Sequence, residues 1–158
     1  MAVKIHSGSV TVLDLTFIPT ASSGSIPFVR HGVSDWFPKV AATIVRFADL
    51  QEQWDCENAS RISHAAIGAA LAFCAAAAES EANAPNVYPL ATGGILLEWL
   101  DEPEGFDILA EVGHAGDSVS ISIERNDEEI DEVVFPAADI AVIVPSLMQF
   151  GHKAQSTI

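Results

Sequence analysis

Two stretches of alternation, residues 106–112 and 118–124, constrain the fold of this chain more than any other feature. In both stretches every second residue is apolar, and the acidic and serine residues lie between these apolar positions. A period of two places the apolar side chains on one face of a strand and the polar ones on the other. The connection between the stretches is short and contains Gly and Asp, which favours antiparallel pairing. The pattern therefore predicts an antiparallel sheet with one buried face.

Further strand candidates flank this pair. Residues 94–100 follow a turn at Gly93-Gly94, and residues 129–135 alternate less regularly. Together these segments predict an antiparallel β-meander within residues 93–135. Residues 10–18 alternate as well and predict an N-terminal strand. The sheet is therefore expected to contain four or five strands.

Helical spacing appears on both sides of the meander. The N-terminal part, residues 1–53, contains an amphipathic helix that is expected to begin near Ser34 or Asp35, with Pro38 in its first turn, and to run to about Gln53. A C-terminal helical segment at 136–150, interrupted by a proline, is expected to close over the sheet.

An Ala-rich helix is expected within residues 58–82, from about Ser60 to Glu81, with Asn58 or Ser60 as its cap. Small side chains all round this helix allow close approach of its neighbours, so it is expected to be the central helix. The whole chain, residues 1–158, thus predicts a single α+β domain with two or three helices packed on the meander.

Acidic residues are concentrated in the predicted meander. Thirteen acids lie between residues 98 and 132, with Arg125 as the only Lys or Arg among them, and the chain carries a formal net charge of −15. Alternation predicts that Asp107, Glu111 and Glu124 project from the solvent side, and that the turn acids Asp127 and Glu128 extend the same negative field. Such a surface suits either solubility or association with a basic protein partner.

The acidic charge also excludes several classes of partner. Direct binding to nucleic-acid phosphates or to an anionic membrane is not expected. The N-terminus lacks the apolar core of a secretory signal, and the Ala-rich run is too short to span a bilayer. Cys56 and Cys74 are expected to be reduced thiols in a cytoplasmic protein.

Catalytic and metal chemistry find little support in the sequence. The dipeptides Trp54-Asp55 and Glu98-Trp99 each place a ring beside a carboxylate, which suggests either core packing with local backbone capping or an acid–base pair. Cys56 lies between two acids, which disfavours a nucleophilic thiolate. No histidine or cysteine spacing typical of a zinc site occurs, so neither a metal nor a cofactor is expected.

These dipeptides belong to a longer pattern. The chain reads W-D-C-E-N-A at 54–59, P-N-V-Y-P at 85–89 and G-G-I-L-L-E-W at 93–99. It resembles small bacterial and phage proteins of uncharacterised function with the pattern W-D-G-x-G-A, P-x-V-x-P and G-G-(I/V)-x-L-E-W. The resemblance covers roughly residues 54–124. The chain departs from the pattern at Cys56 and Asn58, where the pattern has glycines. It implies an α+β fold, no agreed catalytic residues, and an antitoxin, immunity or defence-linked role.

Three functional hypotheses follow. The leading one is a non-enzymatic binding module whose acidic sheet engages a basic partner. The second is a small hydrolase that uses Asp55 and Glu98 as acid and base. The third is an assembly protein that self-associates through its N-terminal third, burying Leu13, Leu15 or Trp36 between chains.

Overall fold

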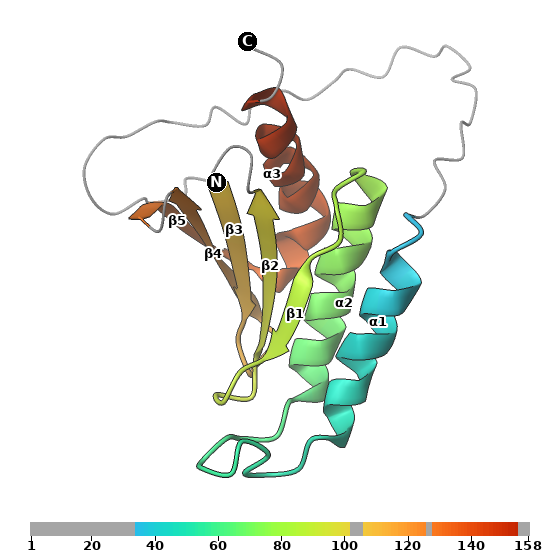
Figure 1. Cartoon of the computed structure of the whole chain (residues 1–158), viewed down its shortest axis with the longest axis vertical. Coiled ribbons are helices and arrows are strands. Elements are labelled where there is room, and N and C mark those ends of the chain that lie inside the picture. The colour runs from blue at the N-terminus through green and yellow to red at the C-terminus, as the bar shows by residue number, and fades with distance from the viewer. Residues whose placement is uncertain (1–33, 102–105, 126–127, 155–158) are drawn as a thin grey trace. The chain divides into compact units, whose positions relative to one another are not determined.

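An antiparallel sheet with helices on one face forms the described part of the protein (Figure 1). The structure is a computed structural model, and it describes residues 34–101, 106–125 and 128–154 of the 158-residue chain. The sequence prediction of an α+β fold, with an antiparallel meander packed against helices, is confirmed. The predicted strand at 10–18 lies outside the described residues.

Five strands pair in chain order, each antiparallel to the next. They are β1 (Asn86–Pro89), β2 (Ile95–Asp101), β3 (Phe106–Val112), β4 (Ser118–Arg125) and β5 (Glu128–Pro136). The sequence did not predict β1, because this strand has only four residues and both Asn and Pro are unfavourable in strands. Its position at the edge of the sheet explains why proline is tolerated there.

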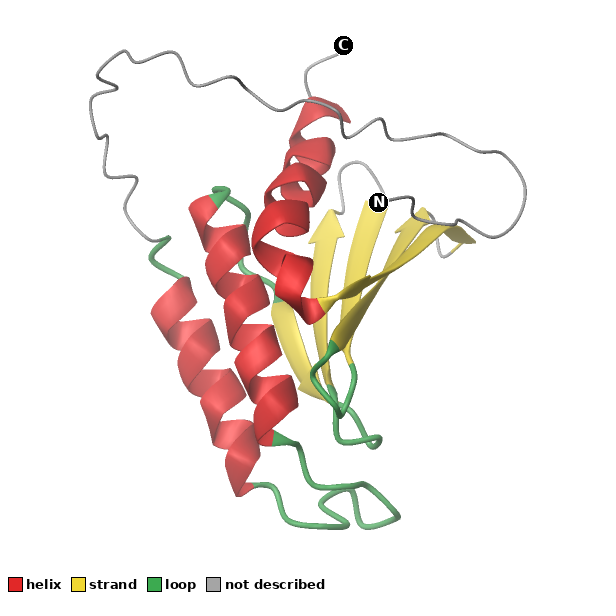
Figure 2. Ribbon diagram, turned by 180° about the vertical axis from the view of Figure 1, so that it is seen from behind, coloured by secondary structure: helices red, strands yellow, loops and turns green. Residues whose placement is uncertain are grey.

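Three α-helices cover a single face of the sheet (Figure 2). They are α1 (Phe37–Arg46), α2 (His64–Glu79) and α3 (Ile140–Ala154), with short 3-10 turns η1 (Phe47–Asp49) and η2 (Ala137–Asp139). Helix α2 packs against both other helices and against β2 and β3. The prediction of a central Ala-rich helix agrees with this arrangement, since alanine side chains let all these neighbours approach closely.

The predicted start and end of α1 need correction. The helix ends at Arg46, and after η1 the backbone is extended at Leu50, so the segment is not helical to Gln53. Trp36 occupies the N-cap position without a side-chain hydrogen bond. The Ser34 hydroxyl instead donates to the carbonyl of Ala78, 3.0 Å away, and thereby joins the start of α1 to the end of α2.

The start of α2 was also predicted too early. Its cap is Ser63, whose hydroxyl accepts a hydrogen bond from the Ala66 N–H at 2.9 Å. Neither Asn58 nor Ser60 caps the helix, because the chain before Ser63 is held in a loop by other contacts. At the other end of the chain, η2 precedes α3, and α3 continues through Pro145 rather than being interrupted there.

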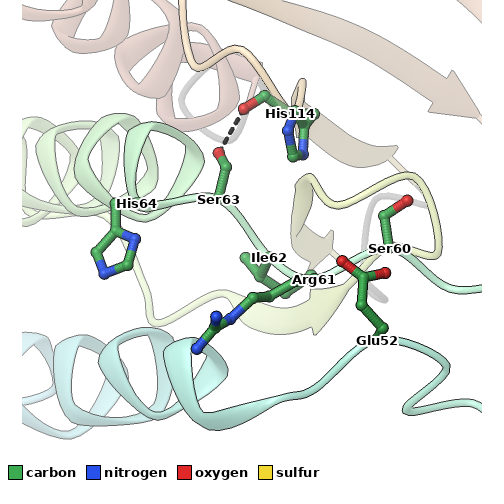
Figure 3. Close-up of a pocket in the computed structure, with 7 residues that line it drawn as sticks. All are labelled: Glu52, Ser60, Arg61, Ile62, Ser63, His64 and His114. Carbon is green, nitrogen blue, oxygen red and sulfur yellow. Dashed lines mark hydrogen bonds between the residues drawn. The ribbon is translucent and has the colours of Figure 1, made fainter.

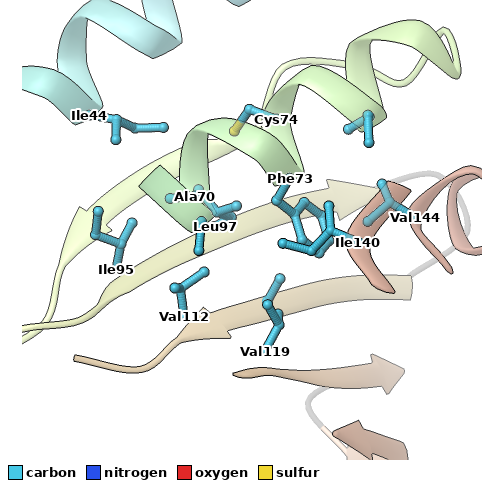
Figure 4. Close-up of a cluster of buried hydrophobic side chains, with 14 of the residues drawn as sticks. Ile44, Ala70, Phe73, Cys74, Ile95, Leu97, Val112, Val119, Ile140 and Val144 are labelled. Atoms are coloured by element: carbon cyan, nitrogen blue, oxygen red, sulfur yellow. The ribbon is translucent and has the colours of Figure 1, made fainter. Parts of the chain in front are cut away.

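The core lies between the helices and the inner face of the sheet (Figure 4). Phe73 of α2 is fully buried, and it stands among apolar side chains from every layer. Fully buried members of this cluster include Ile95, Leu97, Val112, Val119 and Val144. Alternate residues of β2, β3 and β4 are thus committed to the core, so their neighbours in sequence must form the opposite face of the sheet.

Candidate functional site

The face of the sheet opposite the helices, called the outer face below, carries four of the residues predicted to be functional: Glu98, Asp107, Glu111 and Glu124. Strand register places its residues in rows across the sheet. One row runs Tyr88, Leu96, Glu111, Ser120, Val134, the next Asn86, Glu98, Leu109, Ser122, Glu132, and a third begins Leu100, Asp107, Glu124.

Among the side chains that the structure describes, five acids share this face: Glu98, Asp107, Glu111, Glu124 and Glu132. Asp107 and Glu124 are direct register partners on β3 and β4, so two like charges stand side by side. Like charges directly opposite each other destabilise a strand pair. Within the described residues, the strand register assigns no lysine or arginine to the outer face. The prediction that Asp107, Glu111 and Glu124 share one side of the meander agrees with this register.

The other two predicted acids are Asp127 and Glu128. Asp127 lies outside the described residues. Glu128 is the first residue of β5, and its register partner is Arg125, the basic residue of this segment.

Large apolar side chains lie among these acids, which the sequence analysis did not anticipate. Tyr88, Leu100 and Val134 are 45%, 50% and 58% exposed. Leu96 and Leu109 are half-buried on the same face. These residues could have been found by following the alternation of each strand outward, since an apolar residue at a solvent-facing position breaks the pattern.

Glu98 is held in place at the β1–β2 end of the outer face. Its carboxylate accepts a hydrogen bond from the Asn86 side-chain amide at 3.3 Å, and it also interacts with the Tyr88 hydroxyl. Desolvation, the negative charge of Glu98 and the hydrogen bond to this carboxylate together raise the pKa of Tyr88 above its ordinary value of 10.0. Each effect disfavours the phenolate, so the tyrosine keeps its proton as a donor to Glu98.

This coupling predicts a measurable shift, because Tyr88 is the only tyrosine of the chain. Absorbance at 295 nm as a function of pH should give a midpoint above 10.0 for the native protein. Glu98→Gln should lower that midpoint, since it removes the charge and the carboxylate acceptor. Glu111→Gln, which removes the same charge from a position two strands away, should lower it less. Equal midpoints in all three proteins would disprove the coupling.

The sign of the linked stability change follows from the raised pKa. Between the ordinary pKa of 10.0 and the higher folded value, only the folded state keeps the proton. The contribution to stability is therefore complete below the ordinary pKa and is lost as the pH rises through the folded value.

The two Trp-acid dipeptides have structural contacts in different parts of the fold. Trp99 points into the core, where it is 8% exposed, and its indole N–H donates to the Asn83 carbonyl at 2.8 Å. The Trp54 indole N–H donates to the Ser60 carbonyl at 3.2 Å, and Asp55 accepts from the N–H groups of two residues in the same loop. Asp55 thus organises the loop before α2, and it does not cap the helix itself.

The loop requires an unfavourable backbone conformation at Cys56, which has a φ of +66°. The pattern W-D-G-x-G-A, which this segment resembles, has glycine at this position. Glycine is the residue that adopts positive φ most readily. Asn58 is not among the residues with positive φ.

Cys56 is exposed, whereas Cys74 is buried in α2, and burial raises the pKa of the Cys74 thiol to about 12.

We therefore expect one reactive thiol per native chain. At pH 8 a disulfide reagent such as Ellman's reagent should modify Cys56 in the native protein, because this thiol is exposed. Cys74 should react only when the protein unfolds, since both burial and its raised pKa oppose thiolate formation. Denaturant should expose the second thiol, and Cys56→Ser should leave the native protein unreactive. Two thiols modified at similar rates without denaturant would contradict the buried position of Cys74.

A hollow of about 510 Å³ lies where the segment before α2 meets the loop between β3 and β4 (Figure 3). Arg61, His64 and His114 line it, together with Glu52 and Ser60. The Ser63 hydroxyl donates to the His114 backbone carbonyl, and it accepts from the Ala66 N–H. The first contact ties the start of α2 to the loop between β3 and β4, and the second caps the helix, so both hydrogen bonds of Ser63 are structural.

Neither Asp55 nor Glu98 lines this hollow. Asp55 lies in the loop before α2, and Glu98 lies on β2 with its own partners on β1. The described geometry gives each carboxylate a separate set of contacts. Trp36, proposed as a contact between chains, is half-buried and donates its indole N–H to the Ala82 carbonyl at 2.8 Å. Leu13 and Leu15 lie outside the described residues.

The described residues contain no group of three or more His, Cys, Asp or Glu that could hold a metal ion. Within them, too, every helix falls short of the length and apolar character needed to cross a bilayer.

Comparison of the whole chain with protein-family models, curated proteins and solved structures gave no match.

Proposed function

We propose that this protein is a non-enzymatic binding module whose outer face engages a basic surface of another protein. One observation carries the proposal: five of the described acidic side chains share the outer face of the sheet, and two of them, Asp107 and Glu124, stand directly opposite each other. This pair is unfavourable in the isolated protein. Positive charges from a partner would convert the repulsion into attraction, and they would also accelerate association.

The proposed biological setting follows from the resemblance to small bacterial and phage proteins. In this setting the protein is a cytoplasmic antitoxin, immunity protein or defence-linked inhibitor. A toxin that acts on nucleic acid carries a basic substrate site, and an acidic protein can occupy such a site by presenting carboxylates in place of phosphates.

The acids of the outer face can be tested as a group. Asp107→Asn, Glu111→Gln and Glu124→Gln, combined in one variant, should leave the fold intact, because none of these side chains is buried. The free energy of unfolding should stay constant or rise slightly as repulsion is relieved. Binding to the cognate partner should weaken, mainly through a slower association rate, and should depend less on salt.

A matched variant controls for net charge. Asp49→Asn, Glu52→Gln and Glu79→Gln remove the same charge from exposed positions on the helical side of the molecule. Affinity capture from the native host, compared among the wild type and the two variants, identifies the partner. A basic protein that binds the wild type and the control but not the outer-face variant supports the proposal. Equal association rates for both variants at low salt would exclude the outer face.

A further inference from the structure

The exposed apolar side chains of the outer face constrain the kind of partner surface that can bind there, in addition to the constraint set by its negative charge. Four apolar side chains of β1, β2 and β3 lie in neighbouring register positions around Glu98 and are called the apolar band: Tyr88, Leu96, Leu100 and Leu109. Tyr88 pairs with Leu96, while Leu109 stands beside Glu98, between Leu96 and Leu100 on the neighbouring strand. A purely charged partner surface would leave this band in contact with water, whereas apolar side chains placed on it would gain transfer free energy.

Acidic residues lie within and beside this apolar band on β2 and β3. Glu98 lies within it, and Asp107 and Glu111 lie beside Leu100 and Leu96 on β3. An apolar strip with carboxylates along it is complementary to an apolar strip with Lys or Arg along it. A second copy of this chain is a poor complement, because its net charge is −15.

The shape of the surface selects the type of segment that fits. A strand laid flat on the face of a sheet would leave its backbone N–H and C=O groups without partners. A helix satisfies these groups internally, and α2 already packs in this way on the inner face. Leu96 and Leu100 are four residues apart, about 13 Å along a strand, and residues i and i+8 of a helix are separated by about 12 Å.

From these features we infer that the outer face binds a basic amphipathic helix of the partner protein. The apolar stripe of this helix would lie on the band of Tyr88, Leu96, Leu100 and Leu109. Its flanking Lys and Arg side chains would meet Glu98, Asp107 and Glu111. This inference rests on the proposed function, since it names the element of the basic partner that is bound.

Designed peptides test the inference with the full chain. The first is a basic amphipathic helix with leucine at positions i, i+4 and i+8 and lysine or arginine on both flanks. The second has the same composition and charge in a scrambled order without an apolar stripe. The amphipathic peptide should bind about tenfold more tightly or better, as expected for burial of one or two leucine side chains. Amide shifts of the ¹⁵N-labelled protein should map binding to β1–β3.

Two protein variants test whether the tighter binding of the amphipathic peptide depends on the apolar band. Leu100→Thr replaces a half-exposed leucine with a residue suited to strands, so it should fold and should reduce the amphipathic peptide's advantage severalfold. Val142→Thr makes a comparable change at a position of α3 that is 73% exposed and should leave the advantage unchanged. Loss of the preference in Leu100→Thr alone supports the inference.

The remaining outcomes separate the two proposals. Equal, salt-sensitive binding of both peptides, abolished in the Asp107, Glu111 and Glu124 triple variant, would overturn the helix inference and leave the proposed function standing. No binding of either peptide at low salt would overturn both. A dimer of the protein that Leu100→Thr dissociates would assign the band to self-association and overturn the inference.

Discussion

Replacing Trp99 by alanine should lower the free energy of unfolding by about 3–5 kcal/mol. The indole is 8% exposed, and its ring lies 5.6 Å from the ring of Phe73, centroid to centroid. Alanine would leave a cavity between the sheet and α2. It would also remove the N–H group that donates to the Asn83 carbonyl. A loss of this size is a large share of the stability of an ordinary domain.

Trp99→Phe is the matched control for this experiment. It keeps an aromatic ring against Phe73 but loses the hydrogen bond to Asn83, so we expect a smaller loss of about 1–2 kcal/mol. Denaturant melts should be followed by far-ultraviolet circular dichroism, because Trp36 and Trp54 also contribute to fluorescence. A loss below about 1 kcal/mol for Trp99→Ala would mean that the ring does not belong to the core.

Replacing Gly93 by alanine should destabilise the protein by about 2–4 kcal/mol through backbone strain and overpacking. Gly93 has a φ of +86°, a conformation that other residues adopt at a cost. A Cβ atom at this position would meet the imidazole of His114, and it would lie 2.8 Å from the carbonyl oxygen of Arg61. The turn before β2, the segment before α2 and the loop after β3 approach one another closely here.

Gly68→Ala should have the opposite effect on the stability of the protein. Gly68 lies inside α2, and a Cβ atom there would meet nothing within 4 Å. Alanine should therefore stabilise the helix by up to about 1 kcal/mol through its higher helix propensity. Midpoints of denaturant melts that move in opposite directions for the two variants would agree with the structure. A Gly93→Ala midpoint equal to that of the wild type would contradict the close approach.

Strand positions in the meander could be predicted well from the sequence. The alternation at 106–112 matches β3 at both ends, and β4 extends one residue beyond the predicted 118–124. The reason is physical, because the helices cover only one side of these strands and each strand therefore carries a period of two. The same logic identified Asp107, Glu111 and Glu124 as neighbours on one face.

Helix boundaries were predicted less well because they depend on contacts between distant residues. Ser34 could not be distinguished from a cap by its sequence, since its bond to the Ala78 carbonyl spans 44 residues. Ser63 caps α2 in place of Asn58 or Ser60, because Trp54 and Asp55 hold the preceding segment in a loop.

The sequence by itself determined the α+β class, the meander from β2 to β5 and the side of the meander on which Asp107, Glu111 and Glu124 lie, because alternation and local charge are properties of adjacent residues. Only the tertiary structure decided which residues meet across strands and loops. Strand register set Asp107 against Glu124 and aligned Tyr88, Leu96, Leu100 and Leu109 into one band. Loop packing brought Arg61 and His64 to the same hollow as His114. These juxtapositions arise from pairing and packing over long separations, which no local pattern encodes.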